Sequence, residues 1–252
     1  MSLLSKVKRR VFKTAAPVAK TEEPDEFLGW LHFANAGMLA PGNIAGIEYA
    51  ISHLPDASPI VEIGSFCGLS ANVISYLLTK YQAANELICS DAWIFEGARG
   101  DAQLGKHPHV THAAYREYVR SSFMRNVQFF NPHRVPYAVE LVSDQFIEAW
   151  TRADSVTDVF GRTRKLGGRI SFAYIDGDHT YEQCKRDFQN IDRLLAPGGF
   201  ILLDDSSCPQ FGVGSVLKEA LQSNTYRLIL ENPNALLQKL GAPADQPLMK
   251  KR

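Results

Sequence analysis

Acidic residues gather at two points in the C-terminal half of the chain, and each group directly follows a short apolar run. Asp176 and Asp178 flank a glycine, and Asp204 and Asp205 are adjacent. If the two runs are neighbouring parallel strands, their carboxyl ends meet at one edge of a sheet and the acids converge there. Converging carboxylates repel one another unless a cation binds or their pKa values rise. Hard oxygen ligands of this kind suit Mg²⁺, Ca²⁺ or Mn²⁺.

The alternative is that these acids cap separate turns and helices, which is most plausible for Asp178 beside its glycine. Two acidic clusters, each at the end of an apolar run, favour a cation site over that alternative. His179 comes next in the chain and fits three roles: a general base, a substrate contact or the first residue of a helix.

A glycine turn follows the first strongly apolar run, in the segment 61–70. A strand that ends in such a turn and leads into a helix presents free backbone N–H groups to a ligand. The turn lacks the GxGxxG pattern of a pyrophosphate-binding loop, and a ligand with a carboxylate and no diphosphate needs less room. A glycine turn without any ligand is the alternative. The candidate cofactor contacts here are Glu62, Gly64, Ser65, Gly68 and Ser70.

Further acids end the next two apolar runs. Asp91 ends the second run, where a carboxylate can accept hydrogen bonds from ribose hydroxyls. Ser143 and Asp144 end the third run and are candidates for the purine edge of a cofactor. Each of these residues is also a plausible cap for the segment that follows. The glycine turn and Asp91 together indicate a cofactor that contains a nucleoside.

The elements that must position these residues alternate along the chain. Apolar runs rich in β-branched residues alternate with helical patterns, which predicts a parallel sheet covered on both faces. The last two runs flank the turn 231–234 and predict a terminal antiparallel pair. The expected strands are 59–63, 87–91, 138–142, 170–175, 200–203, 226–230 and 235–239, and the expected helices include 44–54, 69–82 and 180–195.

We divide the chain into five segments on this basis. Residues 1–25 are a basic flexible tail, 26–58 an N-terminal helical cap, and 59–241 the cofactor-binding domain. Residues 93–136 contain histidines and aromatic residues but few strand signals, so we expect a lid or substrate insertion. Residues 242–252 form a C-terminal tail.

Composition excludes several classes of protein. The 252 residues carry 27 basic and 27 acidic side chains, which gives no reason to expect a nucleic-acid partner. No apolar run reaches the roughly 18 residues that cross a bilayer, so integral membrane contact is not expected. The basic residues of 1–20 are typical of a solvated tail, although contact with a membrane surface is the alternative. Four scattered cysteines indicate reduced thiols and a cytoplasmic protein.

These motifs together resemble the class I S-adenosylmethionine-dependent methyltransferases over roughly residues 35–240. The glycine turn resembles the first cofactor motif of that class, and Asp91 matches its ribose-binding acid. The terminal strand pair resembles the reversed last strand that separates this fold from nicotinamide-binding folds. The resemblance implies an α/β, Rossmann-like, doubly wound and mostly parallel seven-stranded sheet.

The stretch from Tyr174 to Asp205 is similar to a narrower group, the macrocin and novobiocin-type sugar O-methyltransferases and the cephalosporin hydroxylase-like proteins. In metal-dependent members the matching positions bind Mg²⁺, which implies Asp176, Asp204 and Asp205 as ligands. Asp176 is also a candidate cofactor contact. In the sugar enzymes the second Asp of an Asp-x-Asp motif is the proposed base. The matching residue here is Asp178, so the resemblance implies Asp178 as the base, with His179 as the alternative.

The resemblance therefore implies transfer of a methyl group from S-adenosylmethionine to a hydroxyl of a small molecule. A sugar or polyhydroxylated natural product is the first expectation for the acceptor, and a catechol-like phenol is the second. A homo-oligomer is possible in such families. Two other classes stay open, a nicotinamide-dependent oxidoreductase or epimerase and a non-catalytic module that binds S-adenosylmethionine.

Overall fold

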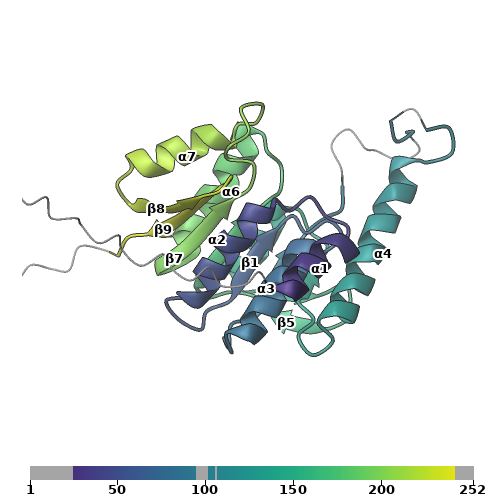
Figure 1. The fold of residues 1–252 in the computed structure, drawn as a ribbon, viewed down its shortest axis with the longest axis horizontal. Coiled ribbons are helices and arrows are strands. Elements are labelled where there is room, and N and C mark those ends of the chain that lie inside the picture. Colours follow the sequence, from purple (N-terminus) through teal and green to yellow (C-terminus); the bar gives the residue numbers. More distant parts are fainter. Residues whose placement is uncertain (1–24, 95–101, 106, 242–252) are drawn as a thin grey trace, which may run out of the picture.

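The computed structural model describes residues 25–94, 102–105 and 107–241, which form an α/β fold (Figure 1). The C-terminal tail expected at 242–252 lies outside the described residues, as does the basic tail apart from Asp25. The main sheet has seven strands, and a separate hairpin has two. The strands of the main sheet are β1 (Ile60–Ile63), β2 (Leu87–Ser90), β3 (Tyr137–Val139), β6 (Ile170–Ile175), β7 (Leu195–Leu203), β8 (Tyr226–Glu231) and β9 (Ala235–Lys239).

The order along the main sheet is β3-β2-β1-β6-β7-β9-β8. The first five strands in this order run parallel. Strand β9, the last of the described strands, lies between β7 and β8 and is antiparallel to both. The expected mostly parallel, seven-stranded sheet with a reversed last strand is therefore confirmed.

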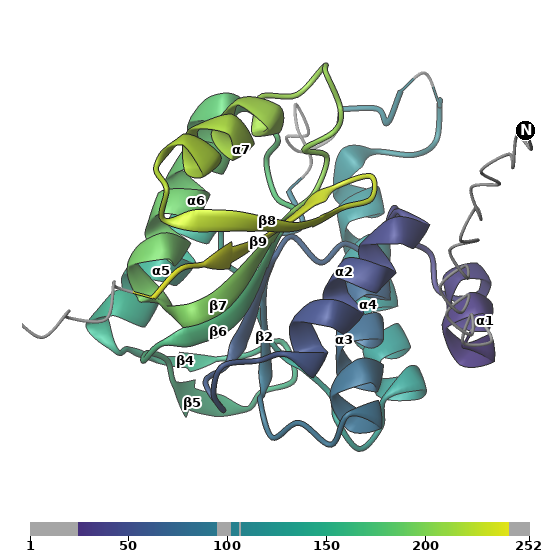
Figure 2. The ribbon, with the colours of Figure 1, turned by 60° about the vertical axis from the view of Figure 1, so that its left-hand side comes forward.

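Helices cover both faces of the sheet (Figure 2). One face carries α2, α3 and α4, with α1 packed on α3, and the other carries α5, α6 and α7. Each face buries its own apolar core, as expected for a parallel sheet whose strands are buried on both sides. The helices are α1 (Glu26–Ala34), α2 (Pro41–Ser52), α3 (Leu69–Lys80), α4 (His112–Phe130), α5 (Ser143–Arg152), α6 (Tyr181–Leu194) and α7 (Val213–Gln222).

The register of the parallel strands brings their carboxyl ends to one edge. Ile63 at the end of β1 pairs with Ser90 of β2 and with Ile175 of β6. Ile175 in turn pairs with Leu203 at the end of β7. The residues that follow these strands, which include the glycine turn and the acidic clusters, therefore start side by side.

The segment 93–136, expected as a lid or substrate insertion, contains the long crossover helix α4 in its described part. Thr111 caps this helix by accepting a hydrogen bond from the backbone N–H of Ala114. Val119, Phe123 and Val127 are buried in the core beneath it. Residues 95–101 and 106 lie outside the described residues, and a role for this segment in substrate binding remains a prediction.

Smaller differences from the expected elements have local causes. Strand β3 ends at Val139 instead of residue 142, because Val142 is already the N-cap of α5. The hairpin of β4 (Ser155–Thr157) and β5 (Thr163–Lys165) was not predicted. Both strands are three residues long and largely exposed, so they lack the apolar run that marks a buried strand.

None of the described helices combines the length and apolar character needed to cross a membrane.

Candidate functional site

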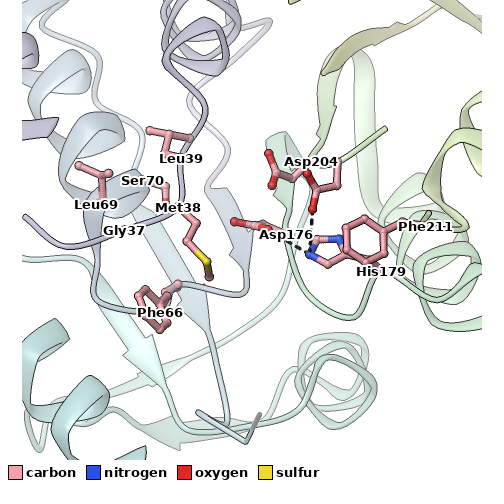
Figure 3. Close-up of a pocket in the computed structure, with 12 residues that line it drawn as sticks. Gly37, Met38, Leu39, Phe66, Leu69, Ser70, Asp176, His179, Asp204 and Phe211 are labelled. Carbon is pink, nitrogen blue, oxygen red and sulfur yellow. Dashed lines mark ion pairs between the residues drawn. The ribbon is translucent and has the colours of Figure 1, made fainter. Parts of the chain in front are cut away.

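A cavity of about 310 Å³ opens at the carboxyl edge of the sheet (Figure 3). It lies between the loop before α2, the glycine turn after β1 and the acidic residues after β6 and β7. The cavity is lined by Gly37, Met38, Leu39, Ser65, Phe66, Leu69, Ser70, Asp176, His179, Asp204, Asp205 and Phe211.

The glycine turn is tight because two strand ends meet there. Gly64 has a φ of 82°, and a Cβ added to it would lie 1.9 Å from the carbonyl oxygen of Asp176. Gly68 has a φ of 85° and is the left-handed N-cap of α3. Only glycine adopts such angles without strain. Ser65 in the turn and Ser70 at the start of α3 line the cavity, and their contact with a cofactor remains a prediction.

Asp91 lies beneath the glycine turn, outside the cavity lining. Its Oδ2 accepts hydrogen bonds from the backbone N–H groups of Ser65 at 2.8 Å and Phe66 at 2.9 Å, and its Oδ1 accepts one from Trp93 at 2.6 Å. Burial raises the pKa of Asp91, and these backbone donors oppose that rise. Asp91 thus holds the turn in shape, and its contact with a ribose remains a prediction.

Glu62 is fully buried within β1 and does not line the cavity. The hydroxyl of Ser65 donates a hydrogen bond to its Oε2 at 2.6 Å. Burial raises the pKa of Glu62, while the hydrogen bond from Ser65 opposes the rise. The buried acid therefore restrains Ser65 from below, and direct contact with a cofactor remains a prediction.

The acids after β6 and β7 converge, as the sequence predicts. Asp176, Asp204 and Asp205 all line the cavity together with His179. The His179 Nε2 atom lies 3.7 Å from Asp176 Oδ1 and 3.7 Å from Asp205 Oδ2 (Figure 3). Asp205 has a φ of 53°, an uncommon backbone conformation for a residue other than glycine.

The crowding of these carboxylates changes their acidity. Burial, followed by the adjacent Asp204, raises the pKa of Asp176 well above its usual range. Burial and Asp204 also raise the pKa of Asp205, and His179 opposes that rise. A positive charge in the cavity would relieve the repulsion.

Two asparagines hold Asp204 from either side, and no motif in the sequence marks either of them. The side-chain amide of Asn43, in the first turn of α2, donates a hydrogen bond to Asp204 Oδ1. The amide of Asn234, in the turn before β9, donates to the same oxygen at 2.8 Å. Both asparagines are in turn-like segments of the sequence, where this residue is common, so no local signal distinguishes them.

The donor set fits a hard cation by its chemistry, because three carboxylates line one cavity. In the part of the chain that the structure describes, no group of three or more His, Cys, Asp or Glu side chains is arranged so that it could hold a metal ion. The Oδ1 atom of Asp204 accepts hydrogen bonds from the two amides, and Asp204 also forms side-chain hydrogen bonds with Tyr174 and Asp176. A bound metal therefore remains a prediction.

Three other candidate residues lie away from the cavity lining. Asp178 is exposed, and its Oδ1 accepts a hydrogen bond from the backbone N–H of Thr180 at 2.8 Å. Ser143 accepts a hydrogen bond from Gln183, and the exposed Asp144 is 3.6 Å from the Nε of Arg186. These contacts match the capping and structural alternatives, while roles for the three residues in catalysis or cofactor binding stay predictions.

A seven-stranded sheet of this order, with a reversed last strand and a glycine turn after its first strand, defines the class of S-adenosylmethionine-dependent methyltransferases. Residues 61–206 match the family described as "Methyltransferase domain", and the chain belongs to this family. The resemblance seen in the sequence is thereby confirmed. No curated protein sequence matches the chain.

Several solved structures share this fold. The O-methyltransferase NovP matches with a TM-score of 0.54 and 14% identity, over 83% of this chain and 84% of that one. CalS11, a TDP-rhamnose 3′-O-methyltransferase, matches with a TM-score of 0.51 and 16% identity, over 78% of each chain. An O-methyltransferase from Bacillus cereus in complex with SAH matches with a TM-score of 0.53 and 13% identity, over 86% of this chain and 91% of that one. At these identities the likeness shows the fold alone.

Proposed function

We propose that the protein transfers a methyl group from S-adenosylmethionine to a hydroxyl of a small molecule, with the help of a divalent cation. One observation carries the proposal: the glycine-turn serines and the cluster of Asp176, His179, Asp204 and Asp205 line the same cavity. The names of the similar structures NovP and CalS11, both O-methyltransferases, support a hydroxyl acceptor. A sugar or polyhydroxylated compound is the acceptor class that the sequence resemblance implies.

The cofactor supplies a methyl group on a positively charged sulfur when it is bound. The turn from Gly64 to Gly68 and the start of α3 would bind its amino-acid part through backbone N–H groups. Asp91 would keep this turn in place and accept a hydrogen bond from a ribose hydroxyl with its remaining lone pair. The rigid turn would thus hold the methyl group close to the acceptor oxygen, which lowers the entropic part of the barrier.

Asp176, Asp204 and Asp205 would hold the cation, because their carboxylates line the cavity among the residues that the structure describes. A bound Mg²⁺ supplies Lewis acidity, which lowers the pKa of a nearby hydroxyl. The amides of Asn43 and Asn234 fix the orientation of Asp204 before any ligand arrives.

His179 is the better placed of the two candidate bases. Its ring lines the cavity, whereas Asp178 is exposed and accepts the N–H of Thr180. The Nε2 atom of His179 would accept the proton of the attacked hydroxyl. Asp176 and Asp205, each 3.7 Å from this nitrogen, would stabilise the positive charge that forms on the ring.

Calorimetry tests this proposal in two steps. S-adenosylhomocysteine is titrated into the full chain in EDTA, and Mg²⁺ is then titrated into the metal-free complex. We expect saturable binding in both titrations. Asp204→Asn should weaken Mg²⁺ binding at least about ten-fold, since it removes a charged ligand. Asp178→Asn, the same chemical change at an exposed position, should leave it unchanged.

The two titrations separate the parts of the proposal. Absence of S-adenosylhomocysteine binding would contradict the assigned cofactor. Binding of S-adenosylhomocysteine without any Mg²⁺ binding, or a loss of Mg²⁺ binding in Asp178→Asn alone, would contradict the proposed cation site.

A further inference from the structure

Aromatic side chains gather on the outside of the molecule, where α1 meets the C-terminal end of α4. The ring centroids of Trp30 and Phe130 are 5.6 Å apart, and those of Phe129 and Phe130 are 5.0 Å apart. Phe33 follows Trp30 by three residues and therefore lies on the same side of α1. We call Trp30, Phe33, Phe129 and Phe130 the aromatic patch. Two helices that are far apart in the sequence form it together.

Most of the aromatic patch is exposed to solvent. Phe33 is 92% exposed, Phe129 is 73% exposed and Trp30 is 52% exposed, whereas Phe130 packs in part against the core. Single exposed apolar side chains are ordinary on a protein surface, but a group of them marks a surface that interacts with another apolar surface or with a membrane. Tryptophan, phenylalanine and leucine form the apolar face of helices that lie in the interface of a bilayer.

The charges next to the aromatic patch do not oppose contact with an anionic surface. Arg125 is exposed on α4 one turn before Phe129, and it forms no ion pair with any residue that the structure describes. The carboxylate of Asp25 is paired with Lys80 at 3.0 Å. Within α1 the single acid is Glu26, which lies in the first turn of the helix.

The segment that leads into α1 is rich in positive charge. Residues 1–20 carry six basic side chains and no acidic one, and five of the six fall within residues 6–13 together with Val7, Val11 and Phe12. A cluster of this size is attracted to the headgroups of anionic lipids. The 12 residues from position 13 to Asp25 can span up to about 40 Å. The basic cluster and the aromatic patch can therefore contact one flat surface at the same time.

We propose that the aromatic patch and the basic segment 1–20 together dock the protein on a negatively charged bilayer surface. The aromatic rings enter the headgroup region, and the basic side chains bind the anionic headgroups. The patch separates this role from that of a solvated tail, because a tail in solution leaves the rings in water. Docking of this kind is peripheral and reversible, and it does not depend on the proposed function.

The fluorescence of Trp30 tests the inference in the full chain. The chain has three tryptophans, and Trp93 and Trp150 are each 1% exposed, so a change on vesicle binding reports on Trp30. The protein is titrated with vesicles of phosphatidylcholine alone and with vesicles that also contain phosphatidylglycerol. We expect binding to the anionic vesicles to be at least about ten-fold tighter, with a blue shift of the emission as Trp30 leaves water. Trp30→Phe should bind the same vesicles, measured by co-sedimentation, without the shift.

Neutralising the basic cluster provides the second measurement. The triple variant Lys8→Gln, Arg9→Gln and Arg10→Gln should weaken binding to the anionic vesicles at least about ten-fold. The matched control removes the same charge at the other end of the sequence, through Lys250→Gln, Lys251→Gln and Arg252→Gln. Its affinity should stay within about two-fold of the parent protein, because only the basic cluster that precedes the patch contacts the lipid.

Variants of the aromatic patch provide the third measurement. The double variant Phe33→Ser and Phe129→Ser should also weaken binding to the anionic vesicles at least about ten-fold, because it removes two rings from the headgroup region. Leu228→Ser with Leu240→Ser is the matched control. These two leucines are 41% and 43% exposed and lie at the β8 edge of the sheet, away from the patch. All four side chains are exposed, so neither variant should disturb the core.

Four results would overturn the inference. The first is equal binding to neutral and anionic vesicles, and the second is equal binding of the patch variant and its control. The third is vesicle binding that leaves the emission of Trp30 unchanged, since the basic segment would then act alone. The fourth is a blue shift that grows with protein concentration in buffer without vesicles, which would assign the patch to a second copy of the chain.

Discussion

Asp187 is a buried carboxyl that does not line the cavity at the carboxyl edge of the sheet. It lies in α6 with 1% of its surface exposed, and its Oδ1 accepts a hydrogen bond from Gln183 at 3.0 Å. Burial raises its pKa to about 6, and hydrogen bonds from Ser143 and Gln183 oppose the rise. Asp187 is therefore a group whose ionisation works against the folded state near neutral pH.

The direction of this effect follows from the two pKa values. Below about pH 4 the carboxyl is protonated in both the folded and the unfolded chain, so it does not change the free energy of unfolding. Between about pH 4 and pH 6 only the unfolded chain releases the proton, so the free energy of unfolding falls as the pH rises. Above about pH 6 the decrease in the free energy of unfolding stays constant at about 3 kcal/mol.

Replacing this carboxyl should make stability less dependent on pH. We expect Asp187→Asn to raise the free energy of unfolding by about 1–3 kcal/mol at pH 7.5 and to change it little at pH 4. Urea denaturation of both proteins at the two pH values measures the difference. Glu231→Gln, which neutralises an exposed carboxyl, is the control and should shift neither value by more than about 0.5 kcal/mol. Equal effects of Asp187→Asn at both pH values would contradict the assignment.

At the scale of elements, the cavity depends on how closely β1 and β6 approach one another at their carboxyl ends. The strands pair in parallel up to Ile63 and Ile175, and the chain then turns away at Gly64 and Asp176. The backbone N–H of Asp176 donates a hydrogen bond to the carbonyl of Ile63 at 2.8 Å. This contact leaves no room for a side chain at Gly64 and places Asp176 beside the glycine turn.

An alanine at this position should therefore be costly. Gly64→Ala combines a positive φ of 82° with a contact of 1.9 Å to a backbone oxygen, and we expect a loss of about 4 kcal/mol or more in unfolding free energy. Gly161→Ala is the matched control, because Gly161 has a φ of 79° and open space around it. That variant should lose about 1–2 kcal/mol. Denaturant unfolding compares the two, and equal losses would mean that backbone strain alone makes Gly64 necessary.

At the scale of the whole molecule, the cavity is completed by residues from both ends of the described chain. The family match covers residues 61–206, but Asn43 and Asn234, which hold Asp204, lie outside it. The start of α2 packs tightly on the turn before β9, where a Cβ added to Gly42 would lie 2.1 Å from the carbonyl oxygen of Asn232. Helix α2 and the turn before β9 thus both supply a hydrogen bond that orients the carboxylate of Asp204.

This arrangement predicts energetic coupling between two distant parts of the sequence. We expect Asn43→Ala and Asn234→Ala each to lower the free energy of unfolding by about 1–3 kcal/mol, since each removes a buried donor to a carboxylate. The double variant should deviate from additivity by at least about 0.5 kcal/mol, because both amides bind the same oxygen. A double-mutant cycle by urea denaturation measures this coupling.

A second cycle supplies the reference for that comparison. It combines Asn43→Ala with Gln128→Ala, which removes an exposed amide on α4, and it should be additive. If the cycle of the two asparagines were additive as well, Asp204 would not link α2 to the hairpin.

The sequence by itself determined the sheet, its reversed last strand and the strand ends that carry the acids. These features depend on local patterns. Apolar runs that alternate with helices indicate a parallel sheet, even when it is not known which strands pair with each other. The convergence of Asp176, Asp204 and Asp205 followed from that topology. The three-residue strands β4 and β5 escaped prediction because they are too short and exposed to show a pattern.

Only the tertiary structure decided which side chains reach the cavity. Asp178 and His179 are neighbours in the sequence, yet one caps a turn and the other lines the cavity. Met38 and Phe211 form walls, and Asn43 and Asn234 hold Asp204, although none of the four belongs to a recognisable motif. Their roles arise from contacts between residues far apart in the chain. Such contacts exist only after the helices and the hairpin pack against the sheet, so no local pattern records them.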